Sequence, residues 1–122
     1  MIDHIGVLVS NYGASKRFYE RALEPLGYSL VMEVSAAAGF GAGGNPSFWI
    51  AESGENAPTA THIAFASPDR ATVNAFFETA VAAGGRDNGA PGLRPHYHPH
   101  YYGAFVLDPD GHNIEAVCHH PE

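Results

Sequence analysis

An internal repeat with a spacing of 58 positions constrains the fold of this chain more than any other feature. Without gaps, this shift aligns His4 with His62. The other matched pairs are Ile5 and Ile63, Phe18 and Phe76, Tyr19 and Phe77, Glu20 and Glu78, Ala22 and Ala80, and Gly27 and Gly85. They include a strand start, a helix face and a helix stop, so the chain is interpreted as two copies of one module. The predicted modules are residues 1–57 and 58–122, within one domain.

Each copy is predicted to contain a strand, a helix and then further strands. In the first, a strand at 3–9 precedes a helix from about residue 12 to 23, with strands at 28–34, 37–42 and 47–51. In the second, a strand at 62–66 precedes a helix capped by Ser67 with Pro68 in its first turn. Strands follow at 103–108 and 113–118, and residues 88–100, rich in Gly, Pro and His, are predicted to be a long loop.

Alternation along the predicted strands separates two faces. In residues 3–9, Ile5, Val7 and Val9 form an apolar set that can pack on a helix, and His4 lies on the opposite face. The strands at 62–66 and 113–118 show the same pattern, with His62 and Glu115 opposite the apolar set. Small residues line this second face, which indicates the wall of a cavity.

Two imidazoles and one carboxylate in corresponding strand contexts predict a metal centre formed by His4, His62 and Glu115. Such a set leaves open positions on a divalent cation, as catalytic metal sites require. Zinc, nickel, manganese and ferrous iron all suit these donors, so the metal is left open. The alternative for any single strand histidine is a hydrogen-bonded core residue.

Composition excludes several classes of partner. The net charge is −7 with six Lys and Arg residues, which argues against nucleic acid and anionic lipid. No long apolar run predicts a membrane span, and the start of the sequence does not resemble a signal peptide. With a single cysteine as well, we expect a cytoplasmic protein.

These features together resemble the vicinal oxygen chelate superfamily, which includes glyoxalase I, extradiol dioxygenases and the fosfomycin and bleomycin resistance proteins. The resemblance covers nearly the whole chain. It rests on His4 and His62 opening the two modules and on Asp-Pro-Asp-Gly at 108–111 followed by Glu115. It implies an α+β fold in which two tandem βαβββ modules form a curved mixed sheet around a metal cavity. It also implies a small-molecule substrate and a homodimer.

The resemblance implies a metal-dependent lyase or isomerase of the glyoxalase type, acting on a small substrate that chelates the metal through two oxygens. Glyoxalase I has a further ligand on the last strand of the first module, where this chain has Trp49, or Glu52 if the strand shifts register. Extradiol dioxygenases have a tyrosine where this chain has Phe105, although Tyr101 or Tyr102 could supply the hydroxyl. A non-catalytic binding protein like those of antibiotic resistance is the third alternative.

The segment from Arg94 to Tyr102 contains three histidines at alternate positions. His96 and His98 are predicted as general acid–base residues and Tyr102 as a proton donor, since histidine titrates near neutral pH. A second surface metal site, or a polar loop without a function, would explain the same pattern. We expect His112, His119 and His120 to be exposed. Residues predicted to contact the substrate are Trp49, Arg94 and Phe105.

Overall fold

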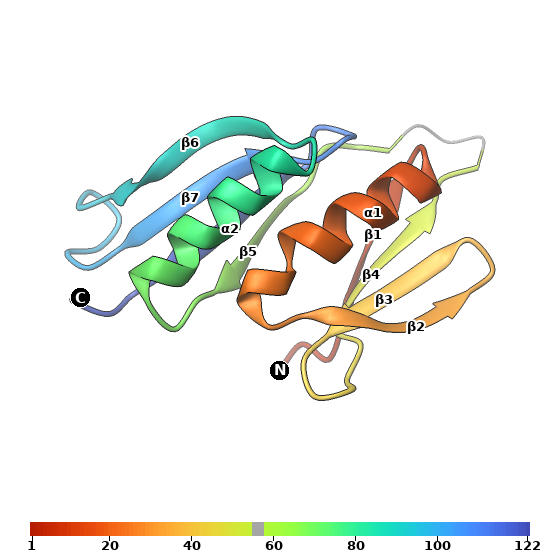
Figure 1. Ribbon diagram of the computed structural model, residues 1–122, viewed down its shortest axis with the longest axis horizontal. Coiled ribbons are helices and arrows are strands. Elements are labelled where there is room, and N and C mark those ends of the chain that lie inside the picture. Colours follow the sequence, from red (N-terminus) through yellow and green to blue (C-terminus); the bar gives the residue numbers. More distant parts are fainter. Residues whose placement is uncertain (55–57) are drawn as a thin grey trace.

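The computed structural model describes residues 1–54 and 58–122 and contains the predicted strand–helix–three-strand unit twice (Figure 1). The first unit consists of β1 (Ile5–Val9), α1 (Tyr12–Ala22), the 3-10 turn η1 (Glu24–Leu26), β2 (Ser29–Val34), β3 (Ala37–Gly41) and β4 (Phe48–Glu52). The second consists of β5 (His62–Ala66), α2 (Arg70–Ala82), β6 (Arg86–Leu93), β7 (Tyr102–Leu107) and β8 (Asn113–Cys118). The boundary predicted at residue 57 lies outside the described residues.

Each unit forms its own four-stranded mixed sheet. The strand orders are β1-β4-β3-β2 and β5-β8-β7-β6, and only the pairs β1–β4 and β5–β8 are parallel. The registers of these two pairs are equivalent, because Gly6 pairs with Trp49 while Ala64, 58 positions further on, pairs with Glu115. The α+β fold with tandem βαβββ modules is therefore confirmed.

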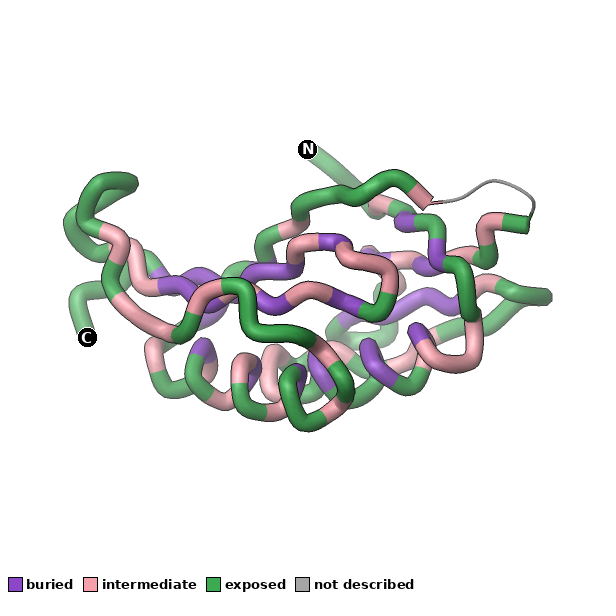
Figure 2. Tube along the Cα trace, turned by 90° about the horizontal axis from the view of Figure 1, so that it is seen from above, coloured by how far each residue is buried: buried purple, intermediate pink, exposed green. Residues whose placement is uncertain are grey.

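Both helices cover the same side of the two sheets (Figures 1 and 2). Helix α1 buries Phe18, Tyr19 and Ala22, and α2 buries Val73, Phe76 and Ala80, as the helical period of each apolar stripe predicts. Against them lie the inward residues of the strands, which include Val7, Val9, Ile50, Phe65 and Ile114. In residues 1–54 and 58–122, no helix lies on the opposite face of either sheet.

Apolar side chains are exposed on the helix-free face of the first sheet. Cross-strand partners point to the same side, so Leu8 shares a face with Val34, and Trp49 shares it with Met32. Leu8, Met32 and Val34 are each about half exposed, at 47%, 48% and 54%. Among the described residues, no helix is long and apolar enough to cross a membrane.

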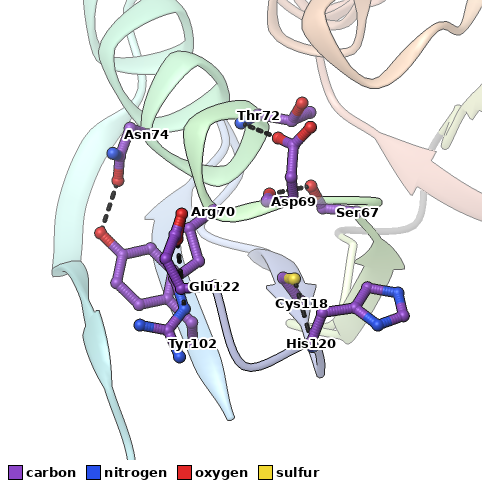
Figure 3. Close-up of polar contacts among 9 residues, drawn as sticks. All are labelled: Ser67, Asp69, Arg70, Thr72, Asn74, Tyr102, Cys118, His120 and Glu122. Carbon is purple, nitrogen blue, oxygen red and sulfur yellow. Dashed lines mark hydrogen bonds and ion pairs between the residues drawn. The ribbon is translucent and has the colours of Figure 1, made fainter. Parts of the chain in front are cut away.

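Two predicted boundaries in the second module were wrong. The N-cap of α2 is Asp69, whose carboxylate accepts a hydrogen bond from the backbone N–H of Thr72 at 2.7 Å, whereas the Ser67 hydroxyl donates to the Asp69 carbonyl (Figure 3). Much of the predicted loop at 88–100 is strand β6, which follows β7 with two register shifts. The connection between β6 and β7 is residues 94–101.

Candidate metal centre

His62 and Glu115 meet on the helix-free face of the second sheet. Strands β5 and β8 run parallel, so the two side chains leave the same face from neighbouring positions. The Nε2 atom of His62 lies 3.1 Å from Oε1 of Glu115. The imidazole is half exposed, whereas the glutamate is buried at 1% exposure. A buried carboxylate thus lies next to an imidazole that solvent can reach.

The backbone fixes which nitrogen of His62 faces the carboxylate. Its Nδ1 atom lies 3.0 Å from the carbonyl oxygen of Asn113, and because a carbonyl only accepts hydrogen bonds, Nδ1 must carry a proton. In the neutral ring Nε2 then presents a lone pair to Glu115, so two acceptors face each other unless a proton or a cation lies between them. Metal-bound histidines use this same backbone contact to orient the ligating nitrogen. The pair therefore fits a divalent cation.

The second carboxylate oxygen of Glu115 is held by Tyr101, whose hydroxyl donates a hydrogen bond to Oε2. Burial, followed by the bond to Glu115 and its charge, raises the pKa of Tyr101 above the ordinary value for tyrosine, so the hydroxyl keeps its proton. Gly103 makes room for this contact, since an added Cβ would lie 3.1 Å from Oε2. One oxygen of Glu115 is thus positioned by Tyr101, and the other is turned toward His62.

Two of the predicted substrate-contact residues lie beside the pair. The Phe105 ring is stacked on the His62 ring with centroids 6.2 Å apart, and the Arg94 guanidinium lies 5.5 Å from the Phe105 centroid. Arg94 also donates to the carbonyl of Ala90 at 2.9 Å. This arrangement provides an apolar wall beside His62 and one positive charge against that wall.

His4 does not join His62 and Glu115 within the chain. Its ring is exposed and its Nδ1 lies 2.7 Å from the carboxylate of Asp3. In residues 1–54 and 58–122, no set of His, Cys, Asp or Glu ligand atoms that includes these three lies within 4.8 Å of one another. A cavity of about 280 Å³ lies at the junction of the modules, lined by Asp3 and Ile5 on one side and by Ala64 on the other.

Trp49 occupies the position in the first module that Glu115 occupies in the second. The register between β1 and β4 is unshifted, so Glu52 does not take that position. The indole lies over Gly39, where an added Cβ would be 2.8 Å from two ring carbons. Trp49 is partly exposed on the helix-free face, as expected of an apolar platform.

The other predicted catalytic residues lie elsewhere. Tyr102 points to the helix side of the sheet, where its hydroxyl is 2.7 Å from Oδ1 of Asn74 on α2 (Figure 3). This differs from the prediction, since Tyr101 rather than Tyr102 contacts Glu115. His96 packs on Tyr97 with ring centroids 4.2 Å apart, and His98 packs on His100 and His119. The acid–base role of these two histidines stays a prediction.

Sequence reasoning missed the role of His112, which was expected to be exposed and is 1% exposed. Its Nδ1 accepts a hydrogen bond from the backbone N–H of Thr61 at 3.0 Å, and Nε2 lies 2.8 Å from the carbonyl oxygen of Leu8. A ring that accepts at one nitrogen and donates at the other links β1, the segment before β5 and the β7–β8 turn.

His112, Asp108 and Asp110 place ligand atoms within 4.8 Å of one another, the arrangement of a small metal site. Their hydrogen bonds indicate a structural turn instead. Asp108 accepts from the Tyr19 hydroxyl and from the backbone N–H groups of residues 110 and 112, and both carboxylate oxygens of Asp110 accept from the Ser10 N–H. With both ring nitrogens of His112 also engaged, this group connects the two modules.

The fold and the paired His and Glu side chains define a class of proteins built from tandem βαβββ modules. Within it, a family model described as the glyoxalase/bleomycin resistance protein/dioxygenase superfamily matches residues 1–116. The chain belongs to this family. No curated protein matches it.

Solved structures agree with this assignment. A glyoxalase/bleomycin resistance protein from Albidiferax ferrireducens T118 has 26% identity and a TM-score of 0.83, with 95% of this chain and 96% of that chain covered. A glyoxalase/bleomycin resistance protein/dioxygenase family enzyme from Burkholderia phytofirmans PsJN has 16% identity, a TM-score of 0.76 and 98% coverage of both chains. A glyoxalase-related enzyme from Fulvimarina pelagi has 22% identity and a TM-score of 0.69, with 97% and 87% covered.

Proposed function

We propose that this chain is a glyoxalase-like, metal-dependent lyase or isomerase whose small substrate chelates the metal through two oxygens. The observation that carries the proposal is the His62–Glu115 pair at 3.1 Å, with the Nδ1 of His62 turned to a backbone carbonyl. A divalent cation held there would supply Lewis-acid polarisation of the substrate oxygens. Zinc, nickel, manganese and ferrous iron remain the candidates, because imidazole and carboxylate suit them all.

We propose that the third ligand, His4, comes from a second copy of the chain in a homodimer. The support is that His4 is exposed and lies outside the group around Glu115, while its face of the first sheet exposes Leu8, Met32 and Val34. Burying such apolar surface favours association by roughly 25 cal/mol per Å². Trp49 on the same face would then form an apolar wall opposite Phe105.

The residues of this chain have distinct roles in the proposed reaction. Glu115 and His62 bind the cation, and Tyr101 holds the Glu115 carboxylate in one orientation through its hydroxyl. Arg94, Phe105 and Trp49 contact the substrate, and the positive charge of Arg94 favours an anionic one. His96 and His98 remain the candidates for moving a proton, because their loop leads directly to Tyr101.

Metal analysis of the untagged protein tests the site and the dimer together. We expect His62→Ala and His4→Ala each to bind one divalent metal per chain fewer than the wild type, with His120→Ala as the exposed control. Because each proposed site combines His4 of one copy with His62 of the other, mixing His4→Ala with His62→Ala chains should restore metal to one site in each mixed dimer. A monomeric protein, or mixed chains that bind no more metal than the two variants bind separately, would rule out the shared site.

Extradiol-type ring cleavage is the second candidate, favoured by the Tyr101 hydroxyl beside Glu115. A panel of hemithioacetals, catechols and fosfomycin, assayed with each metal in turn, separates the two. Oxygen consumption with a catechol would indicate dioxygenase activity and contradict the lyase proposal. Tight ligand binding that is indifferent to chelators, without turnover, would indicate a binding protein. The cytoplasmic location expected from the sequence stays a prediction.

A further inference from the structure

The β6–β7 connection and the end of β8 bring a second group of histidines together, away from Glu115. Strands β7 and β8 are antiparallel with Tyr102 opposite Cys118, so the next residue outward on each strand also becomes a neighbour. Tyr101 and His119 accordingly have ring centroids 5.2 Å apart. The sheet register therefore holds the histidine loop against the segment that follows β8.

His98 is the centre of this group. Its ring centroid lies 5.6 Å from that of His119 and 5.8 Å from that of His100, with interplanar angles of 77° and 64°. When two imidazoles bind one cation at bond lengths of about 2.0 Å and tetrahedral angles, their centroids are roughly 5 Å apart. Both ring pairs that include His98 thus have nearly the spacing that a shared metal would impose.

The loop backbone keeps the rings in this arrangement. The carbonyl of Arg94 accepts from the N–H of Tyr97 at 3.0 Å and of His98 at 3.4 Å, and the N–H of Tyr101 donates to the His98 carbonyl at 3.0 Å. All three histidines are exposed, so a change of rotamer can reorient their ring nitrogens without displacing the core. These nitrogens do not yet lie within 4.8 Å of one another.

We propose that His98, His100 and His119 form a second metal site for a borderline transition-metal cation such as Zn²⁺, Ni²⁺ or Cu²⁺. Three imidazoles select these cations over Mg²⁺ and Ca²⁺, which prefer oxygen ligands. The ligands of this second site are separate from His62 and Glu115, and with His98 bound to a metal the proton-transfer role falls to His96. The site would join the β6–β7 connection to the end of β8.

Metal binding has a structural consequence at His98. Its Nδ1 accepts a hydrogen bond from the His100 N–H at 3.1 Å, so Nε2 carries the proton in the neutral ring. If Nε2 binds the metal, its proton moves to Nδ1, which then cannot accept the hydrogen bond from the His100 N–H. If Nδ1 binds the metal, the metal takes the place of that hydrogen bond. Either route releases the His100 amide, and the change reaches Tyr101 through its contact with His119.

Zn²⁺ titration of untagged His62→Ala/Glu115→Gln protein, in which the first centre is removed, tests the proposal. We expect one Zn²⁺ per chain by competition with a chromophoric chelator, and a shift of the His100 amide in the NMR spectrum. Adding His98→Ala or His119→Ala should weaken binding about tenfold or more, the usual loss for a change in a metal site. His120→Ala, next to His119 in the chain and equally exposed, should bind as tightly as the parent.

Two results would overturn the assignment. One is no Zn²⁺ binding by the His62→Ala/Glu115→Gln protein, with circular dichroism confirming that it is folded. The other is an equal loss for His120→Ala and His119→Ala, which would indicate non-specific binding by a histidine-rich surface. Mg²⁺ serves as the cation control and should leave the His100 amide unshifted.

Discussion

Replacing His112 by alanine should weaken the junction between the two modules. The imidazole is buried. Among the described residues, it is the hydrogen-bond partner of the Thr61 N–H and of the Leu8 carbonyl. A buried polar group that loses its partner costs roughly 1–3 kcal/mol. Both backbone groups are partly buried, so solvent replaces part of each bond.

From these contacts we expect His112→Ala to lower the free energy of unfolding by about 2–4 kcal/mol, including the cavity left by the ring. For a chain of this length, that loss lowers the melting temperature by roughly 10 °C. His112→Gln can still accept and donate through its amide, so its loss should be smaller. Urea and thermal denaturation followed by circular dichroism measure both variants.

The matched control is His120→Ala, which removes an exposed imidazole and should change stability by less than about 0.5 kcal/mol. If His112→Ala is no more destabilising than this control, the turn at residues 108–112 does not hold the modules together. If His112→Ala loses stability only when a divalent metal is present, Asp108, Asp110 and His112 form a metal site instead.

Three further changes test neighbouring parts of the structure. Tyr19→Phe removes the hydroxyl that donates to buried Asp108 and should cost about 1–3 kcal/mol in urea denaturation. Burial, and then the charge of Asp108, raises the pKa of Tyr19, so wild-type stability should fall as pH rises above the ordinary value of 10.0, and Tyr19→Phe should flatten this fall. The hydrogen bond from Thr72 lowers the pKa of Asp69, so the N-cap of α2 should weaken as pH falls below 3.8. Asp69→Ala should remove this pH dependence. Asp69→Ser is the control, because serine can cap the helix without an ionisable group. Gly103→Ala should lower metal affinity about tenfold by displacing Oε2 of Glu115, whereas Gly92→Ala, whose nearest contact is the flexible end of Arg94 at 3.1 Å, should not.

The strand faces could be predicted from the sequence because alternation is a local property. Val7 and Val9 are buried while Gly6 and Leu8 are exposed, as a period of two requires. Alternation likewise predicted that His62 and Glu115 lie opposite the apolar set, and in the structure both lie on the helix-free face of the second sheet. Both inferences needed only the sequence and the geometry of a strand.

Other features depended on contacts between distant residues. Burial of His112 requires Leu8, 104 positions away, and no pattern near residue 112 indicates that partner. Strand β6 was hidden because its Gly and Pro residues are typical of loops, and the strand follows β7 only through two register shifts. The choice between Tyr101 and Tyr102 depended on which residue continues the face of Glu115, and therefore on where β7 begins.

The two modules share a backbone but carry different chemistry at the same cross-strand position. In the second module Ala64, Glu115 and Phe105 lie side by side across three strands. In the first module Gly6, Trp49 and Gly39 occupy the equivalent positions. Gly39 is needed because an added Cβ would lie 2.8 Å from two ring carbons of the indole, whereas a Cβ at Gly6 would make an ordinary contact with Trp49 at 3.9 Å. The two copies therefore have different roles. One copy supplies a buried carboxylate, and the other supplies an apolar surface of the kind that a small organic substrate requires.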